Sequence, residues 1–293
     1  MAFMDKKVKQ GHTFLLLRQT IYILESYQDI WVPAIIILFI QLLVLELLYF
    51  APRYPLSTFF GPIVQTFWGE KYLHYPFNLI ELAEQFQLAQ IPIYIFFSNY
   101  LMAVAIAVIT DINRGQKIIL GKKFIETLRM YVSISMAACV ISVSYVGLIK
   151  LYDMVVQQAS LIDPQKGILY VVKMIVVDGA PYLSLLIGIF ITTLFAFVLP
   201  IIVIEKGKFF KALALNFRMI VRSFWLVLAI VILAHVPFGT ILLLRTTIVK
   251  FSDTVFPELR VIILVISLTL LIVIDTMIYT AMTIYYLFKK ETT

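Results

Sequence analysis

Residues 198–217 read VLPIIVIEKGKFFKALALNF: an apolar run ends at an acid, and lysines lead directly into apolar residues at helical spacing. Pro200 leaves one helical backbone carbonyl without its partner, so it permits a bend one turn before Glu205. Gly207 is free to adopt backbone angles that other residues avoid. A catalytic loop and a ligand site are alternative interpretations. The pattern favours an elbow built by Pro200, Glu205 and Gly207, at which the chain leaves a membrane and turns along its surface.

The rest of the chain supports a membrane setting for this elbow. It has 293 residues, of which 62% are hydrophobic and 14% charged, a balance far more apolar than that of an average soluble domain. A helix needs roughly 20 mostly apolar residues to cross the hydrocarbon core, and the apolar runs are continuous rather than alternating as in a β-barrel. Six helices are predicted, over residues 30–50, 91–110, 129–151, 180–204, 222–244 and 261–287. The predicted fold class is an all-α, polytopic integral membrane protein that forms a single membrane domain over residues 1–293.

Lysine and arginine are distributed unevenly among the connections between these helices. The N-terminal segment, the second-to-third and fourth-to-fifth connections and the C-terminal tail carry 16 of the 24 basic residues. Because basic residues accumulate on the cytoplasmic side, both termini are predicted to be cytoplasmic. Nearly all of the formal net charge of +7 also falls on that side. This charge favours anionic membrane lipids as partners, and the absence of a nucleic-acid-binding motif in the sequence argues against nucleic acid.

The stretch that begins at Gly207 has two earlier counterparts. GHTFLLLRQTIYIL begins at Gly11, GKKFIETLRMYVSI at Gly121 and GKFFKALALNFRMIV at Gly207. All three have Gly-x-x-Phe followed by apolar residues at spacings of three and four, which is typical of an amphipathic helix that lies in the headgroup layer. We predict three hairpins of membrane helices, each preceded by a cytoplasmic interfacial helix, as repeats over 11–110, 121–204 and 207–288. The alternative is a chance likeness, since any juxtamembrane segment tends to be basic and amphipathic.

The predicted interfacial helices should bury their apolar stripes and present their bases to headgroups. The apolar stripes begin at Phe14, Phe124 and Phe210. In the third copy, Lys211, Arg218 and Arg222 fall together on the opposite face. The candidate headgroup-binding residues are Lys122, Lys123, Lys208, Lys211, Arg218 and Arg222.

The extracytoplasmic side is predicted to carry an insertion over residues 51–90. Two short apolar stripes, one from Phe60 to Phe67 and one from Leu79 to Phe86, predict two helices lying on the outer surface. They are interpreted either as a lid over a cavity or, as we prefer, as a cap without a ligand. A third such piece is predicted over residues 164–178. Within the membrane, small residues recur every four positions in the third and fourth helices, so these two helices should touch.

The sequence contains no recognisable catalytic motif. His12, His74 and His235 fall at different levels of the predicted topology and cannot form one metal site. No H-E-x-x-H, glycine-rich phosphate loop or G-x-S-x-G occurs. We therefore predict no catalytic residue, no metal and no cofactor, and a protein that is not an enzyme.

Ionisable side chains inside membrane helices are costly and are candidates for function. Glu46 lies near the outer end of the first predicted helix, and Asp275 lies near the middle of the sixth. His235 lies in the fifth, before Pro237, which should kink that helix. One hypothesis is a proton- or cation-coupled path through these three side chains. The other, which we prefer, is that Glu46 reaches outward to water and hydroxyl groups of neighbouring helices hydrogen-bond to Asp275.

The run FAFVLPIIVIEKGKFFKALALNFRMIVRSFWLVLAIVILA, residues 195–234, resembles a family of six-helix bacterial inner-membrane proteins. This family is related to the membrane domain attached to some glycerophosphodiester phosphodiesterases. NRGQKIILGKKFIETLRMYVSI from Asn113 is a weaker match. This chain has Ala214 or Asn216 where family members usually have a serine, a longer outer loop and no catalytic phosphodiesterase domain. The resemblance implies a module of the bacterial cytoplasmic membrane that handles lipids or assists other membrane proteins.

Two functions follow as expectations from these patterns. The first is a non-enzymatic, lipid-interacting module that supports lipid handling or a membrane complex, with a second membrane protein as an additional candidate partner. The alternative is a small transporter or channel with a proton- or cation-coupled path through the helix bundle. A polar path from Asp275 to Glu46 or His235 would favour the transporter. A tightly packed centre of the helix bundle would favour the lipid-interacting module.

Overall fold

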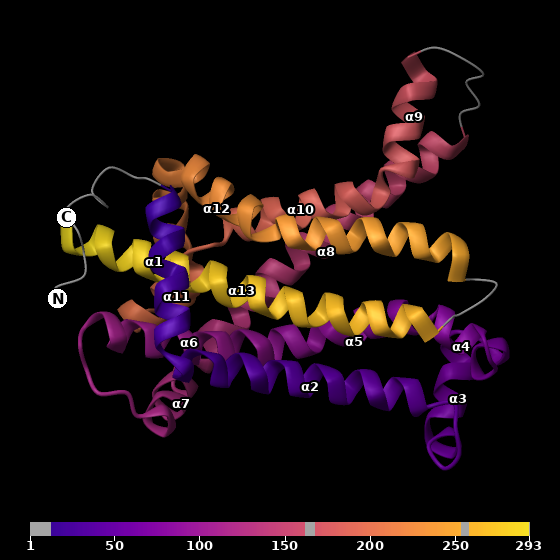
Figure 1. The fold of residues 1–293 in the computed structure, drawn as a ribbon, viewed down its shortest axis with the longest axis horizontal. Coiled ribbons are helices and arrows are strands. Elements are labelled where there is room, and N and C mark those ends of the chain that lie inside the picture. The colour runs from indigo at the N-terminus through magenta and orange to yellow at the C-terminus, as the bar shows by residue number, and fades with distance from the viewer. Residues whose placement is uncertain (1–12, 162–167, 253–257, 293) are drawn as a thin grey trace.

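A computed structural model describes residues 13–161, 168–252 and 258–292 of the chain. Within these ranges every regular element is a helix, and no strand occurs. The long helices lie side by side along one axis and form an elongated bundle (Figure 1). The helices that make up the first half are α1 (Thr13–Ser26), η2 (Gln28–Ile30), α2 (Trp31–Phe50), α3 (Ser57–Phe67), η3 (Glu70–Leu73), α4 (Phe77–Ile80), α5 (Leu82–Ile93), the π-helical turn η4 (Tyr94–Ser98), α6 (Asn99–Asn113) and α7 (Leu120–Leu128). The second half contains α8 (Tyr131–Leu161), α9 (Ile168–Asp178), α10 (Ala180–Leu194), α11 (Val198–Glu205), α12 (Phe209–Ser252) and α13 (Glu258–Thr292).

Among the described residues, six helical stretches are long and apolar enough to cross a membrane, as predicted. They are Gln28–Phe50, Leu82–Asn113, Tyr131–Leu161, Ala180–Glu205, Phe209–Leu244 and Glu258–Glu291. Each contains one of the six predicted spans, except that the third begins at Tyr131 rather than at residue 129. The main difference lies in the second, where the stripe from Leu79 to Phe86 does not form a separate surface helix. Leu82 and Phe86 are buried, and α5 continues through η4 into α6.

Three helices meet in the middle of the bundle. α6, α11 and α13 each contact the other two, and every residue of α11 from Val198 to Ile204 is buried. The remaining long helices lie in the grooves between them: α2 contacts α6 and α13, α8 contacts α6 and α11, and α12 contacts α13 and α11. Where α6, α11 and α13 meet, the middle of the bundle is therefore filled by packed helices.

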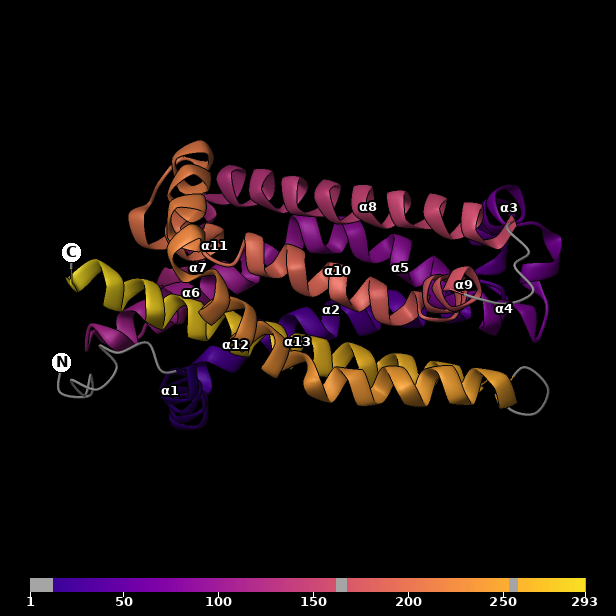
Figure 2. The ribbon, with the colours of Figure 1, turned by 90° about the horizontal axis from the view of Figure 1, so that it is seen from above.

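The shorter helices gather at the two ends of the bundle. At one end, which we call the basic end, lie α1, α7, the junction between α11 and α12 and the last turns of α13 (Figure 1). Here α1 runs across the bundle axis, and the first turns of α12 do the same before that helix bends to follow the axis (Figure 2). The opposite end carries α3, α4 and α9. α12 continues through Pro237 without an interruption.

The contact predicted between the third and fourth membrane helices is present. α8 packs against α10, and a Cβ atom placed on Gly188 would lie 3.8 Å from Cε2 of Tyr145. The ring of Tyr145 therefore lies close to the α10 backbone at Gly188, as small residues permit. The predicted third outer piece is also helical over its described residues, as α9; residues 164–167 lie outside the described part of the chain.

The apolar residues of the short helices lie on two sides. Phe14 and Phe210, which we predicted to face lipid, are exposed on the protein surface. The side that faces the bundle instead carries the buried residues Leu16, Thr20 and Ile23 in α1 and Ala212, Asn216 and Ile220 in α12. The sequence pattern identified the apolar residues but could not separate a side that packs on protein from a side that faces outward.

Candidate functional site

A polar pocket of about 500 Å³ opens at the basic end between α6, α7 and the end of α11. The wall combines the last turn of α6, the connection that follows it, α7 and the residue after α11. It carries five basic and two acidic side chains. The charged residues that line it are Asp111, Arg114, Lys117, Lys122, Lys123, Glu126 and Lys206.

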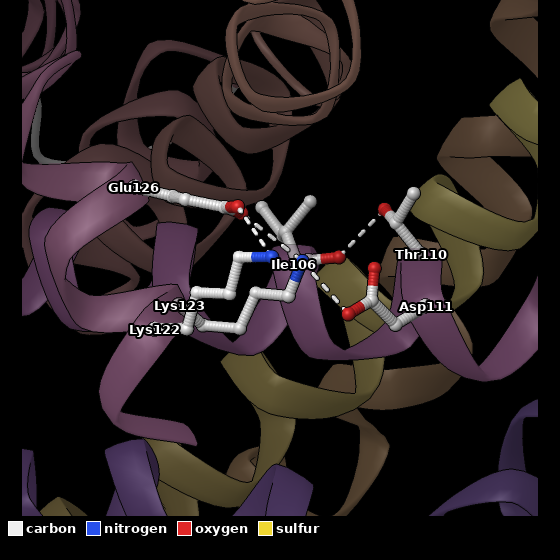
Figure 3. Close-up of polar contacts among 6 residues, drawn as sticks. All are labelled: Ile106, Thr110, Asp111, Lys122, Lys123 and Glu126. Carbon is white, nitrogen blue, oxygen red and sulfur yellow. Dashed lines mark hydrogen bonds and ion pairs between the residues drawn. The ribbon is translucent and has the colours of Figure 1, made fainter. Parts of the chain in front are cut away.

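Lys123 is the central side chain of this wall. Its Nζ lies 2.7 Å from Oδ2 of Asp111 and 3.1 Å from Oε2 of Glu126, as Figure 3 shows. The side chains of Lys123 and Asp111 are 12% and 7% exposed. This ion pair holds α7 against α6, because each residue comes from a different helix and neither charge is left without a partner.

The two carboxylates also act on the protonation of this cluster. Burial alone lowers the pKa of Lys123, but hydrogen bonds to Asp111 and Glu126 and their charges outweigh it, so the pKa is raised. The hydrogen bond from Lys123, opposed by some desolvation and assisted by the charges of Lys206 and Lys122, lowers the pKa of Glu126. Lys123 and Glu126 are therefore both charged at neutral pH.

Thr127, in the last turn of α7, has a hydroxyl group without a partner. The residue is fully buried, lines the pocket, and its Oγ1 forms no hydrogen bond with any described residue. By contrast, Thr110 in the same pocket donates to the carbonyl of Ile106 at 2.8 Å (Figure 3). Nothing in the sequence distinguishes Thr127, because a threonine in an amphipathic helix carries no signal of its own.

The predicted elbow is present, but a different residue makes its turn. α11 ends at Glu205, and Lys206 takes the left-handed conformation with φ of 49°. Gly207 donates its N–H to Ile202 O at 3.2 Å, as in a Schellman cap, and its own φ is not positive. The role assigned to Gly207 was wrong because the cap is positioned by the end of α11, which places the left-handed residue one position earlier.

The other two elbow residues, Glu205 and Pro200, lie at the two ends of α11. Glu205 Oε1 accepts hydrogen bonds from Tyr286 Oη at 3.0 Å and Lys290 Nζ at 2.6 Å, so it ties α11 to α13 rather than to the neighbouring lysines. The helix is interrupted at residues 195–197, and Pro200 lies in the first turn of the new helix α11, where a missing N–H costs little. The break therefore comes before Pro200.

Asn216 closes the break between α10 and α11. Its Nδ2 donates to Leu194 O at 2.8 Å, and its Oδ1 accepts from Phe197 N at 3.1 Å. Both groups are helix-terminal backbone groups that would otherwise be buried without partners. Asn216 is fully buried, and its only distinguishing feature in the sequence is that it departs from the serine usual in the family that the chain resembles.

The remaining headgroup candidates lie apart from the pocket. Lys208, Lys211, Arg218 and Arg222 are exposed on the first turns of α12 and its preceding residue. Lys122 is also exposed and belongs to the pocket. Lys123 differs from all of them because its ion pairs occupy its ammonium group.

No hydrogen bond or ion pair joins the three intramembrane candidates to one another within the described residues. Glu46 is exposed on α2, and His235 is buried on α12 with Nδ1 2.8 Å from Val231 O. Asp275 interacts electrostatically with the phenols of Tyr94 in η4 and Tyr279 in α13. Within the described residues it forms no hydrogen bond, so the predicted hydroxyl partners are not seen. Asn99 beside this cluster donates to Tyr94 O at 2.8 Å, and its buried Oδ1 has no partner in the described chain.

Comparisons with models of protein families, with curated proteins and with solved structures found no match for this chain. The class is therefore defined by the structure alone. A bundle whose described part contains six helices long and apolar enough to span a bilayer is that of a multi-pass α-helical membrane protein.

Proposed function

We propose that this protein is a non-enzymatic, lipid-interacting module whose basic end lies at the cytoplasmic face of a bacterial inner membrane. The observation that carries the proposal is the surface of α12 at the point where it crosses the bundle end. This surface carries exposed apolar side chains next to exposed bases. The apolar residues are Phe210, Phe217, Val221 and Trp225, and the bases are Lys211, Arg218 and Arg222. A helix in the headgroup layer needs such a surface, because one side meets acyl chains and the adjacent side meets anionic headgroups.

We further propose that the bundle is built from three related hairpins, each preceded by an interfacial helix. Consecutive long helices contact each other within each predicted repeat: α2 with α5 and α6, α8 with α10, and α12 with α13. Each preceding helix contacts the returning helix of the previous repeat, since α7 packs on α6, α12 on α11, and α1 on α13. These cyclic relations support an approximate threefold arrangement around α6, α11 and α13.

The resemblance to the phosphodiesterase-associated membrane domain supports the same function. In that interpretation the module handles lipids or assists another membrane protein, and its basic end provides the contact with anionic lipid. Catalysis is not part of the proposal.

Lipid retention tests the proposal directly. The full chain is purified in mild detergent, delipidated, mixed with phosphatidylglycerol and examined by native mass spectrometry. The test variant is Lys211→Gln/Arg218→Gln/Arg222→Gln, and the matched control removes three bases from the opposite end, Arg53→Gln/Lys71→Gln/Lys150→Gln. We expect the first variant to bind phosphatidylglycerol more than about tenfold more weakly, because each base near an anionic surface contributes about 1 kcal/mol, and the control to bind as the wild type does. Delipidated wild-type protein that binds no anionic lipid contradicts the proposal.

A small transporter is the second candidate, and one observation favours it. Asp275 is an ionisable side chain within a membrane span that forms no hydrogen bond in the described structure. It lies beside a π-helical turn, a local widening that is often found at functional sites. The packed centre formed by α6, α11 and α13 favours the lipid-interacting module.

A further inference from the structure

We infer that the pocket between α6, α7 and α11 binds a phosphate monoester group, with the Thr127 hydroxyl and the exposed bases around it as ligands. This inference rests on the proposed function and makes it specific, since it assigns the class of headgroup and the place where that headgroup binds. Chemically the ligand is a dianionic phosphate, which either a lipid headgroup or a free phosphate supplies.

The first support is the exceptional state of Thr127. Six other buried threonines each donate their hydroxyl to the carbonyl four residues earlier; they are Thr20, Thr110, Thr193, Thr276, Thr280 and Thr283. Thr127 makes no such bond. A buried polar group without a partner costs about 1–3 kcal/mol. A ligand oxygen in the pocket would remove that cost.

The charge around Thr127 indicates what kind of ligand fits. Lys123 and Asp111 neutralise each other across 2.7 Å. The other charged side chains of the pocket wall are one acid, Glu126, and four exposed bases, Arg114, Lys117, Lys122 and Lys206. These bases come from three separate segments, after α6, in α7 and after α11, so they surround the pocket rather than form one stripe. An excess of positive charge converging from several directions suits a tetrahedral dianion.

The position of the pocket agrees with a lipid headgroup as the source of this phosphate. The span Leu82–Asn113 ends immediately before Arg114, and the span Ala180–Glu205 ends immediately before Lys206. Both bases therefore lie where two membrane helices leave the hydrocarbon region. A volume of about 500 Å³ holds a phosphate and the glycerol that follows it, because one water occupies only about 30 Å³.

Glu126 gives the pocket a way to select among anions. Its carboxylate accepts a hydrogen bond from Lys123 at 3.1 Å and lies 4.0 Å from Lys122. A phosphate must compete with this carboxylate for the same bases. A dianion competes better than the monoanion of a phosphodiester, since its Coulomb attraction to each base is about twice as large.

The experiment compares two substitutions of the same kind in the same pocket, Thr127→Val and Thr110→Val. Binding of phosphatidic acid, a phosphomonoester lipid, is titrated in nanodiscs or mixed micelles, with phosphatidylglycerol as the phosphodiester and inorganic phosphate as a soluble competitor. We expect Thr127→Val to weaken binding of phosphatidic acid by about tenfold or more, as loss of a hydrogen bond to a charged group does. Thr110→Val should bind as the wild type does, because the Thr110 hydroxyl already has its partner in Ile106.

The outcomes separate the possible sources and failures. Competition by inorganic phosphate supports a site that recognises free phosphate as well, and its absence with intact binding of phosphatidic acid supports a lipid-specific site. Equal binding by Thr127→Val and the wild type overturns the inference, even if the α12 triple variant still loses anionic lipid and the proposed function stands. Equal affinity of the wild type for phosphatidic acid and phosphatidylglycerol also overturns it. The unfolding temperature of Thr127→Val serves as the folding control, and it should not fall because no hydrogen bond within the described chain is removed.

Discussion

The ammonium group of Lys123 lies 2.7 Å from a carboxylate oxygen of Asp111, and this contact fastens α7 to the end of α6. Both side chains are nearly buried. Removing Lys123 leaves Asp111 without its ion-pair partner, and removing Asp111 leaves Lys123 with Glu126 and no other buried carboxylate among the described residues. Breaking a buried pair costs about 3–5 kcal/mol, and we expect Lys123→Gln or Asp111→Asn to approach the lower value because some solvent reaches both groups. Thermal unfolding in detergent measures this loss.

Two variants serve as controls for this ion pair. Lys122→Gln removes a neighbouring charge whose side chain is 66% exposed, and it should cost less than about 1 kcal/mol. The double variant Asp111→Asn/Lys123→Gln should lose less stability than the sum of the losses in the two single variants. Additive losses would show that the two side chains do not act together.

Glu126 predicts how this region responds to acid. Its pKa in the folded protein is below the ordinary value of 4.5, so its charged form stabilises the fold above that pH, and this contribution disappears as pH falls through the lowered pKa. Glu126→Gln should therefore be less stable than the wild type at neutral pH, and the two should converge below about 4.5. Unfolding midpoints measured across this range test the prediction. A constant difference at every pH would contradict it.

Asn216 is expected to be among the most sensitive side chains at the basic end. Asn216→Leu leaves Leu194 O and Phe197 N without partners in a buried site, and each unsatisfied group costs about 1–3 kcal/mol. Hydrogen exchange at the Phe197 amide should accelerate, and the unfolding temperature should fall. Ala214→Leu, at an exposed position of the same helix, is the control and should change neither measurement. If the Phe197 amide of Asn216→Leu exchanged hydrogen as slowly as in the wild type, Asn216 would not be what stabilises the break between α10 and α11.

At the elbow after α11, we expect valine in place of Lys206 to destabilise the protein more than valine in place of Gly207, although the sequence indicates Gly207 as the residue that makes the turn. Lys206 holds φ of 49°, where a β-branched residue is strained by about 1–2 kcal/mol, so Lys206→Val should destabilise the protein and Lys206→Gly should not. Gly207→Val should be tolerated, because a Cβ there would meet only Glu205 Cβ, at 3.7 Å. Size-exclusion profiles and unfolding temperatures of the three variants test this order. Greater damage from Gly207→Val than from Lys206→Val would contradict it.

Asp275→Asn distinguishes the lipid-interacting module from a transporter. No described hydrogen bond is lost, and a neutral amide avoids the cost of a charge within a membrane span, so we expect unchanged folding and unchanged binding of anionic lipid. Reconstituted wild-type protein should show no flux driven by a proton or sodium gradient. Gradient-driven flux in the wild type that disappears in Asp275→Asn at equal reconstitution would instead support transport.

Much of the architecture was accessible from the sequence because it depends on local apolarity. A continuous apolar run long enough to cross a bilayer must satisfy its backbone internally, and all six predicted spans correspond to long apolar helices. The contact between α8 and α10 was also predictable, since small residues such as Gly188 allow close approach whatever the neighbouring helix is.

The relations between residues far apart in the chain were decided only by the tertiary structure. Composition identified Lys123 as a base, but folding places it between Asp111 and Glu126 and so removes it from the set of free bases. Asn216 and Thr127 look alike in sequence as polar residues of amphipathic helices, yet one is fully bonded to a distant helix break and the other is buried without a partner. The physical reason is that apolarity is a property of each segment, whereas hydrogen bonding and charge pairing depend on which segments meet.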